Sequence, residues 1–210
     1  MTEGLIKNLI FDLGGVIINL DMSLSFQKFA KLGNISLEQM NQMAENEPLF
    51  NKYEKGLITS AQFRTGICAL LNRDIPDAQI DIAWNAMLLD IPLERLQFIE
   101  RLKPHYKLLV LSNTNEIHIT EFIKRMDTVY GAKKYDALFD DIYYSHLVNM
   151  RKPAAEIYQF VLQENNIIAQ ETLYLEDNRE NIESSKKLGF MTYEVPTNQL
   201  DLNFLENELL

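Results

Sequence analysis

Five short runs of the sequence are apolar on both faces of an extended chain, and this feature constrains the fold most. Strands buried on both sides have such continuous apolar runs, whereas strands with one solvated face alternate between apolar and polar residues. Helical stretches separate the last four runs, which is the pattern of βαβ units. The sequence therefore predicts an α/β fold with a doubly wound, Rossmann-like parallel sheet, whose strands end near Phe11, Leu111, Ser145, Leu175 and Val195.

The long gap between the first two runs contains no convincing strand. Apolar residues recur in it at helical spacing, and two of its segments begin with the spacing of a capping box, Ser36 with Gln39 and Thr59 with Gln62. Such a segment is too long for a crossover connection, so it predicts an inserted all-helical domain. The expected division is a discontinuous core domain of residues 1–19 and 92–210 and a helical-bundle cap domain of residues 20–91.

Composition is that of a globular protein and limits the partners of the chain. Hydrophobic residues make up 47% of the sequence and charged residues 24%, which is enough apolar surface for a sizeable core. The formal net charge of −10 disfavours a grip on the phosphates of nucleic acid. This net charge is compatible with a locally positive site that binds a small anionic molecule.

Neither disulfides nor membrane insertion is indicated. Cys68 is the single cysteine, which excludes an internal disulfide. The start of the chain lacks the basic region of a signal peptide, and no apolar stretch reaches the roughly 20 residues that a membrane span needs. We therefore expect a cytoplasmic protein with no membrane and no nucleic-acid partner; the sequence does not indicate its oligomeric state.

Polar residues follow four of the predicted strands at their carboxyl ends, where ligands bind in open parallel sheets. Each residue alone could have an ordinary structural role, such as capping a helix or carrying a solvated charge. Those roles would have to hold at all four strand ends at once, so a shared site is the better explanation. The predicted site contains Asp12, Ser112, Asn113, Arg151, Lys152, Glu176 and Asp177.

This combination of side chains suits chemistry on a phosphate group. Carboxylate oxygens are the ligands that Mg²⁺ prefers, with water and phosphate oxygens completing its octahedron. A lysine and a short hydroxyl or amide side chain stabilise the charge that develops on phosphate oxygens. An aspartate between them can attack phosphorus and form an aspartyl-phosphate. These residues therefore point to a Mg²⁺-dependent phosphatase.

With these residues identified, the chain resembles the haloacid dehalogenase superfamily. In order, "FDLGGV" resembles the nucleophile loop of that family, "LSNT" its hydroxyl motif, "RKP" its lysine motif and "LEDNREN" its acidic metal-binding motif. The resemblance extends over the whole chain, because the helical insertion lies where the family has a helical-bundle cap. The residues of these motifs are similar to those of a branch of the family that contains sugar-phosphate phosphatases, including glucose-1-phosphate phosphatases. This similarity implies a small phosphorylated metabolite as substrate.

The resemblance also implies a nucleophile and a set of metal ligands. Asp12 would be the nucleophile, and its carboxylate would bind Mg²⁺ as well. The backbone carbonyl of Gly14 and the carboxylate of Asp177 would complete the protein ligands, with Glu176 beside them. Gly14 would thus belong to both the metal site and the substrate-binding turn.

The same resemblance implies how the phosphoryl group is held. Ser112 and the amide of Asn113 would bind its oxygens, and Lys152 would neutralise its charge, so that Ser112 and Lys152 join the nucleophile as catalytic residues. His118 lies shortly after the hydroxyl motif and could approach the substrate. A structural or surface role is the more common one for a histidine in such a place.

Gly14 departs from the family pattern. Most phosphatases of the family have an aspartate there, which serves as general acid and base, and such help is typically worth about 10²–10⁴ in rate. Three explanations stay open. Another group, such as Asp21, a cap residue or a metal-bound water, takes over; or the leaving group needs little protonation, as in acyl or anomeric sugar phosphates; or the protein is a weak enzyme or none.

Two other functions remain as alternatives. A haloacid dehalogenase also lacks the second aspartate and would direct Asp12 at a carbon-bound halide. It would have no need of metal ligands, however, and Glu176 and Asp177 are both present. A catalytically inactive module that binds a phosphorylated ligand or a protein would explain Gly14, although the other motif residues are intact.

Overall fold

In the computed structural model, residues 6–210 are described. The first five residues, where the predicted core domain begins and where a signal peptide would start, lie outside this range. The described chain contains one five-stranded sheet, in the order β3-β2-β1-β4-β5, with every neighbouring pair parallel. Its strands are β1 (Asn8–Phe11), β2 (Lys107–Ser112), β3 (Asp141–Tyr144), β4 (Thr172–Glu176) and β5 (Met191–Glu194).

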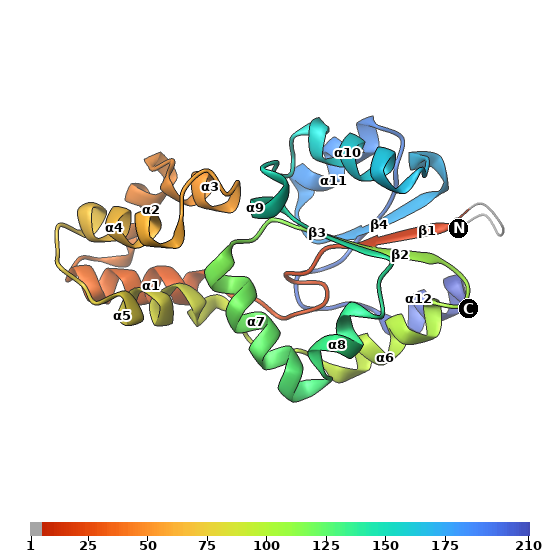
Figure 1. The fold of residues 1–210 in the computed structure, drawn as a ribbon, viewed down its shortest axis with the longest axis horizontal. Helices are drawn as coiled ribbons and strands as arrows, with labels where there is room; N and C mark the ends of the chain where they lie inside the picture. The colour runs from red at the N-terminus through yellow and green to blue at the C-terminus, as the bar shows by residue number, and fades with distance from the viewer. Residues whose placement is uncertain (1–5) are drawn as a thin grey trace.

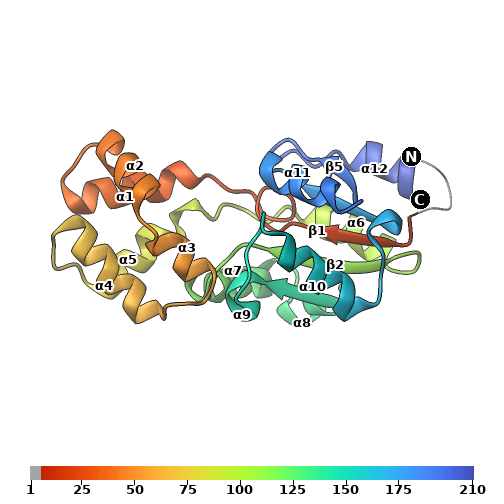
Figure 2. The ribbon, with the colours of Figure 1, turned by 90° about the horizontal axis from the view of Figure 1, so that it is seen from above.

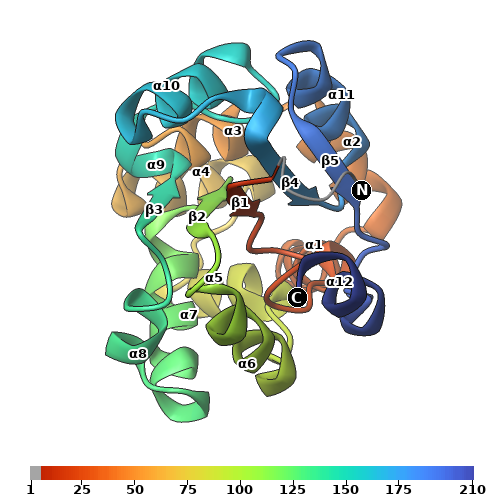
Figure 3. The ribbon, with the colours of Figure 1, turned by 90° about the vertical axis from the view of Figure 1, so that its right-hand side faces the viewer.

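Helices cover both faces of the sheet, so the doubly wound prediction is confirmed (Figure 1 and Figure 3). One face carries α10 (Ala155–Asn165) and α11 (Arg179–Lys187). The other face carries α6 (Leu93–Leu102), α7 (Glu116–Val129), α8 (Ala132–Asp136) and α12 (Leu202–Leu209). None of the helices in the described part of the chain has both the length and the apolar character of a membrane span.

The central strands divide their side chains between two separate cores. Leu9 and Phe11 of β1 pack into the core that continues into the helical insertion, whereas Ile10 packs with residues of α10. The expectation that all five strands are buried on both faces is wrong for β3 and β5, whose residues are largely half-buried or exposed. These two lie at the edges of the sheet, where each strand has only one neighbour.

The segment between β1 and α6 is helical, as predicted, and forms a cap beside the carboxyl ends of the strands (Figure 2). Both capping boxes are present, because the side chains of Ser36 and Thr59 accept hydrogen bonds from the backbone N–H groups three residues on. The cap helices are α1 (Met22–Gly33), α2 (Leu37–Asn46), α3 (Leu49–Glu54), α4 (Ser60–Leu71) and α5 (Asp77–Trp84), and a 3₁₀ turn (Asn85–Met87) follows them.

The two connections between cap and core run side by side as an antiparallel pair, which we call the hinge ribbon (residues 19–21 and 87–90). Leu20 pairs with Leu88. The backbone N–H of Asp21 donates to the carbonyl of Met87 at 2.9 Å, and that of Leu89 donates to the carbonyl of Asn19 at 3.0 Å. The cap is therefore joined to the core through a short, internally hydrogen-bonded ribbon.

Candidate active site

A cavity of about 540 Å³ lies between the carboxyl ends of the strands and the cap. β1, β2 and β4 each end at it, and the segment after the short helix α9 (Ser145–Val148) forms another wall. The structure brings together every polar residue that the sequence analysis assigned to the site. The cavity is lined by Asp12, Gly14, Ser112, Asn113, Arg151, Lys152, Glu176 and Asp177.

Lys152 occupies the buried centre of this cluster, with 1% of its surface exposed. Its Nζ lies 2.8 Å from a carboxylate oxygen of Asp12 and 2.8 Å from Oε2 of Glu176. The carbonyl of Leu111 and the hydroxyl of Tyr174 complete its surroundings, each also at 2.8 Å. Burial alone would lower the pKa of Lys152, but the two carboxylates outweigh burial and raise it, so the side chain stays charged.

The carboxylates of Asp12, Glu176 and Asp177 are crowded, and one oxygen of each lies within 4.8 Å of the others. Burial, together with the charge of Glu176, raises the pKa of Asp12 to about 7, although Lys152 acts in the opposite direction. Burial is also the main cause that raises the pKa of Asp177 to about 6. A divalent cation among these hard oxygen donors would stabilise the charged carboxylates and so lower both pKa values.

Glu176 differs from its two neighbours because protein donors surround both of its oxygens. Oε1 accepts from the backbone N–H groups of Asp177 (3.1 Å) and Asn178 (3.0 Å). Oε2 accepts from Lys152 (2.8 Å), from the amide of Asn181 (3.0 Å) and from the hydroxyl of Tyr174. A carboxylate offers about four acceptor positions, so this one is saturated. Burial would raise the pKa of Glu176, but Lys152 and these donors lower it.

Asn113 ties the lysine segment to the end of β2. Its side-chain amide donates to the carbonyl of Lys152 at 2.9 Å, and its side-chain oxygen accepts from the backbone N–H of Lys152 at the same distance. Ser112, the last residue of β2, is buried beside it. The chain turns after Lys152, and α10 starts at Ala155.

Helix capping does not account for the residues at the strand ends. Asn115 caps α7, its side-chain oxygen accepting from the N–H of His118 at 3.1 Å. Asn178 caps α11 in the same way. Because these two asparagines cap the helices, Ser112, Asn113 and Asp177 remain available for the site.

The two glycines after Asp12 are constrained by different neighbours. A Cβ atom at Gly14 would lie 2.3 Å from Cδ1 of Leu20, so a leucine of the hinge ribbon fills the space beside that position. Gly15 has φ +74°, and a Cβ there would lie 2.3 Å from a carboxylate oxygen of Asp177. Gly15 therefore allows Asp177 to approach the nucleophile loop.

The cap closes the cavity with apolar side chains and one ion pair. Trp84 and Met87 line it together with Leu88 of the hinge ribbon. Glu54 of α3 pairs with Arg151 of the core, Oε2 to Nε, at 2.5 Å. Arg151, which the sequence analysis counted among the site residues, thus joins the cap to the core beside the cavity.

Three residues that shape the cluster were not predicted from the sequence: Glu54, Tyr174 and Asn181. Tyr174 precedes Glu176 by two positions in β4, and alternate residues of a strand share a face, so "TLYLED" carried a usable signal. Asn181 lies in the first turn of α11, directly over the strand end. Glu54 is far from the site in sequence, and no local pattern indicates its contact with Arg151.

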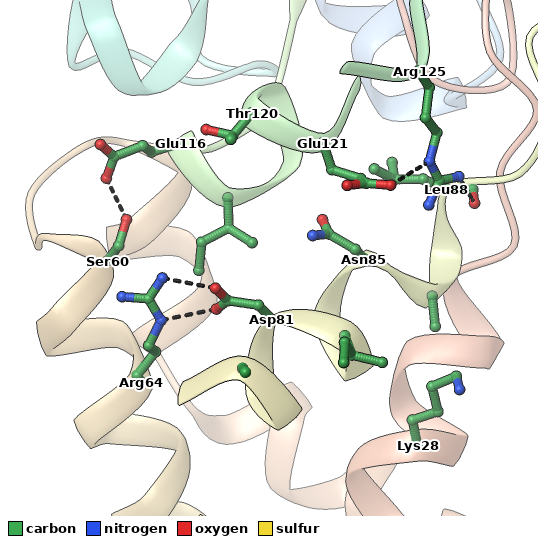
Figure 4. Close-up of a pocket in the computed structure, with 14 residues that line it drawn as sticks. Lys28, Ser60, Arg64, Asp81, Asn85, Leu88, Glu116, Thr120, Glu121 and Arg125 are labelled. Atoms are coloured by element: carbon green, nitrogen blue, oxygen red, sulfur yellow. Dashed lines mark hydrogen bonds and ion pairs between the residues drawn. The ribbon is translucent and has the colours of Figure 1, made fainter. Parts of the chain in front are cut away.

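A second pocket, of about 770 Å³, lies between the cap and the outer side of α7 (Figure 4). Its polar side chains are mostly paired with one another. Arg64 forms two hydrogen bonds of 2.8 Å with the carboxylate of Asp81, and Ser60 donates to Glu116 of the core. The acids of the candidate active site do not line this pocket, so it belongs to the cap–core contact and not to the catalytic cluster.

Comparison with known proteins agrees with this geometry. Residues 91–195 match the family model of haloacid dehalogenase-like hydrolases. Over 197 residues the chain is 30% identical to a D-ribitol-5-phosphate phosphatase of Bacteroides thetaiotaomicron, and the alignment covers 94% of this chain and 95% of that protein. The chain belongs to the haloacid dehalogenase-like hydrolases. The resemblance inferred from the four motifs is therefore confirmed.

Solved structures of the haloacid dehalogenase-like family have the same fold. An enzyme of this family from B. thetaiotaomicron, solved in complex with magnesium and inorganic phosphate, is 34% identical with a TM-score of 0.85, and 95% of this hydrolase and 98% of that chain are covered. A family member from Porphyromonas gingivalis is 27% identical with a TM-score of 0.87 and 98% coverage of both chains. An L-2-haloacid dehalogenase at 17% identity and a TM-score of 0.65 shares the fold alone.

Proposed function

We propose that this hydrolase is a Mg²⁺-dependent phosphatase that acts on a small phosphorylated metabolite through an aspartyl-phosphate on Asp12. One observation carries the proposal: the carboxylate of Asp12 lies at the base of the cavity, 2.8 Å from Nζ of Lys152 and beside the carboxylate of Asp177. This arrangement supplies a nucleophile, a cation and a metal ligand at one point.

Asp12, Asp177 and the backbone carbonyl of Gly14 would hold the Mg²⁺ ion. The fit rests on the crowded carboxylates and on the raised pKa values of Asp12 and Asp177, which a cation would reverse. Glu176 would add negative charge next to the ion while its own oxygens hold Lys152 and the loop. The bound ion would supply positive charge against the phosphate oxygens.

The residues of the chain would then divide the reaction between them. A carboxylate oxygen of Asp12 attacks phosphorus, the bond from phosphorus to the ester oxygen breaks, and water later hydrolyses the aspartyl-phosphate. Lys152 balances the charge of the nucleophile and the phosphoryl oxygens. Ser112 and Asn113 would bind those oxygens; because the side-chain amide of Asn113 holds Lys152, its backbone N–H is the group left for this contact.

A phosphorylated sugar alcohol or sugar is the substrate class we favour. The relative from B. thetaiotaomicron named as a D-ribitol-5-phosphate phosphatase supports it, as does a cavity large enough for a five- or six-carbon chain. The leaving group of such an ester is an alkoxide, which needs a proton. Because Gly14 has no acid side chain, that proton would come from another group or from water.

The test is phosphate release by the purified protein from ribitol 5-phosphate, hexose 1- and 6-phosphates, acyl phosphates and nucleotides, with Mg²⁺ and with a chelator. We expect Mg²⁺-dependent turnover that Asp12→Asn abolishes. Asp201→Asn is the matched control, because Asp201 caps α12 outside the cavity and asparagine also caps helices. Protein that binds phosphate but hydrolyses none of the esters would be a binding module, and halide release from 2-chloropropionate would indicate a dehalogenase.

A further inference from the structure

His118 is a buried residue of the cavity wall that the proposed reaction does not use. It lies in the first turn of α7, just beyond the hydroxyl motif, and 7% of its surface is exposed. Its ring stacks on the indole of Trp84 with 4.5 Å between the ring centroids. Trp84 of the cap thus packs against one face of the ring of His118, which belongs to the core.

A hydrogen bond to the cap also fixes the edge of this ring. Nδ1 of His118 lies 2.9 Å from Oδ1 of Asn85, and the indole N–H of Trp84 donates to the side-chain oxygen of Asn115 at 3.3 Å. An amide oxygen carries no hydrogen, so Nδ1 must be the donor in its contact with Asn85. Burial lowers the pKa of His118 to about 3, which keeps the ring neutral. Nε2 therefore has a lone pair and no proton.

Nε2 of His118 is buried and has no hydrogen-bond partner in the described part of the chain. Buried polar atoms without a partner are rare in folded proteins, and each needs an explanation. Among the described residues that line the cavity, His118 is the one whose buried side-chain nitrogen or oxygen is left unpaired. Trp84, Met87 and Phe122 line the same cavity, and the one polar atom of these three side chains, the indole nitrogen of Trp84, donates to Asn115.

We propose that His118 is a specificity-determining residue whose Nε2 accepts a hydrogen bond from a hydroxyl group of the substrate. This inference rests on the proposed phosphatase function and deepens it. A neutral acceptor requires a donor as its partner, so it favours the hydroxyls of a polyol or sugar phosphate and disfavours a carboxylate or a second phosphate at that place. His118, the residue that selects the substrate, then belongs to the core, and Asn85 and Trp84 of the cap orient its ring.

The experiment compares two esters that differ in hydroxyl groups but share an alkoxide leaving group, ribitol 5-phosphate and n-pentyl phosphate. In His118→Asn the new amide reaches only the position of Nδ1, and in His118→Gln it reaches the position of Nε2. We expect the ratio of the two kcat/KM values to fall about three- to tenfold in His118→Asn, as for one lost hydrogen bond, and to recover in His118→Gln. His146→Asn is the matched control: His146 also has an unpaired ring nitrogen but lies outside the cavity, so the ratio should not change.

Each outcome decides between the two proposals. If the wild-type protein hydrolyses no ester, the phosphatase function fails. If it hydrolyses both esters but their ratio is equal in the wild type and in His118→Asn, or if both His118 variants lose activity alike on both esters, the role of His118 in specificity is overturned. Nitrogen-15 NMR gives a readout independent of activity: the proposal requires a neutral ring protonated on Nδ1, and a proton on Nε2 would contradict it.

Discussion

Three carboxylates and one buried lysine cluster at the ends of the central strands, and this imbalance of charge shapes the chemistry of the site. Lys152 neutralises one negative charge, so the carboxylates of Asp12, Glu176 and Asp177 leave an excess of two when all are ionised. Glu176 stays ionised because its donors lower its pKa, which leaves Asp12 and Asp177 as the groups that hold a proton when no cation is bound.

Magnesium binding should therefore release protons. The pKa values of about 7 for Asp12 and about 6 for Asp177 lie above the ordinary value of 3.8, so between pH 4 and 7 the folded, metal-free protein holds protons that the unfolded chain has lost. Its unfolding free energy should fall as the pH rises through that window. Because Mg²⁺ displaces these protons, we expect its affinity to drop by up to about tenfold between pH 7 and 6.

Calorimetry of Mg²⁺ binding in two buffers with different ionisation enthalpies measures the released protons directly. Asp12→Asn should reduce the release, since it removes the group with the higher pKa. Equal binding enthalpies in both buffers, together with an affinity that does not change with pH, would contradict the assigned protonation states.

Single residues at the strand ends could be identified from sequence, but their partners could not. Asp12 and Lys152 stand within recognisable motifs, whereas the contact between them joins positions far apart in the chain. Tyr174 and Asn181 supply two of the donors that saturate the oxygens of Glu176. Without them, the sequence could not distinguish the role of Glu176 from that of its neighbour Asp177.

At the scale of elements, the loop after β1 meets the hinge ribbon at Gly14 and Leu20. The sequence raised the question of why this position lacks an acid, and the packing gives a steric part of the answer: a Cβ atom at Gly14 would lie 2.3 Å from Cδ1 of Leu20. The backbone at Gly14 is not in the left-handed region, so Leu20 is the obstacle and the φ angle is not.

Gly14→Asp should be destabilising by about 1–3 kcal/mol through overpacking against Leu20. Leu20→Ala removes that obstacle, so the double variant should be more stable than the sum of the two single changes, by a coupling of about 1 kcal/mol. Urea unfolding of the four proteins measures the cycle. Gly66→Asp is a matched control, because a Cβ there meets Leu49 at 2.5 Å, and its effect should add to that of Leu20→Ala. Additivity in the first cycle would show that Leu20 does not exclude the acid.

Elements with a strong local signal were predictable, and those set by neighbours were not. The two capping boxes and the buried central strands appear in the structure as the sequence indicated. The partial exposure of β3 and β5 follows from strand order, which one sequence does not reveal. The start of α10 after Pro153 depends on how the lysine segment docks against Asn113.

At the scale of the whole molecule, the cap is docked on the core around the cavity. Glu54 with Arg151, Ser60 with Glu116 and Asn85 with His118 each join a cap residue to a core residue. The helical insertion could be predicted because its length and periodicity exclude a crossover. Its docking could not, since these contacts depend on the angle of the hinge ribbon.

Asn198 holds one strand of the hinge ribbon from the core. Its side-chain oxygen accepts from the N–H of Leu20 at 2.7 Å, and its side-chain amide donates to the carbonyl of Leu20 at 2.8 Å. Asn198 has φ +66°, a conformation that glycine adopts without strain, so Asn198→Gly removes the two hydrogen bonds and leaves the backbone path intact.

We expect Asn198→Gly to loosen the cap. Two lost hydrogen bonds are worth about 1–3 kcal/mol, so amide exchange in residues 19–21 and 87–90 should become at least about fivefold faster, as hydrogen–deuterium exchange can measure. Asn166→Gly is the matched control: Asn166 also has a positive φ of 51° but ends α10, away from the hinge ribbon, and should leave that exchange unchanged. If Asn198→Gly accelerated exchange throughout the core and not in the ribbon, Asn198 would stabilise the fold and would not restrain the cap.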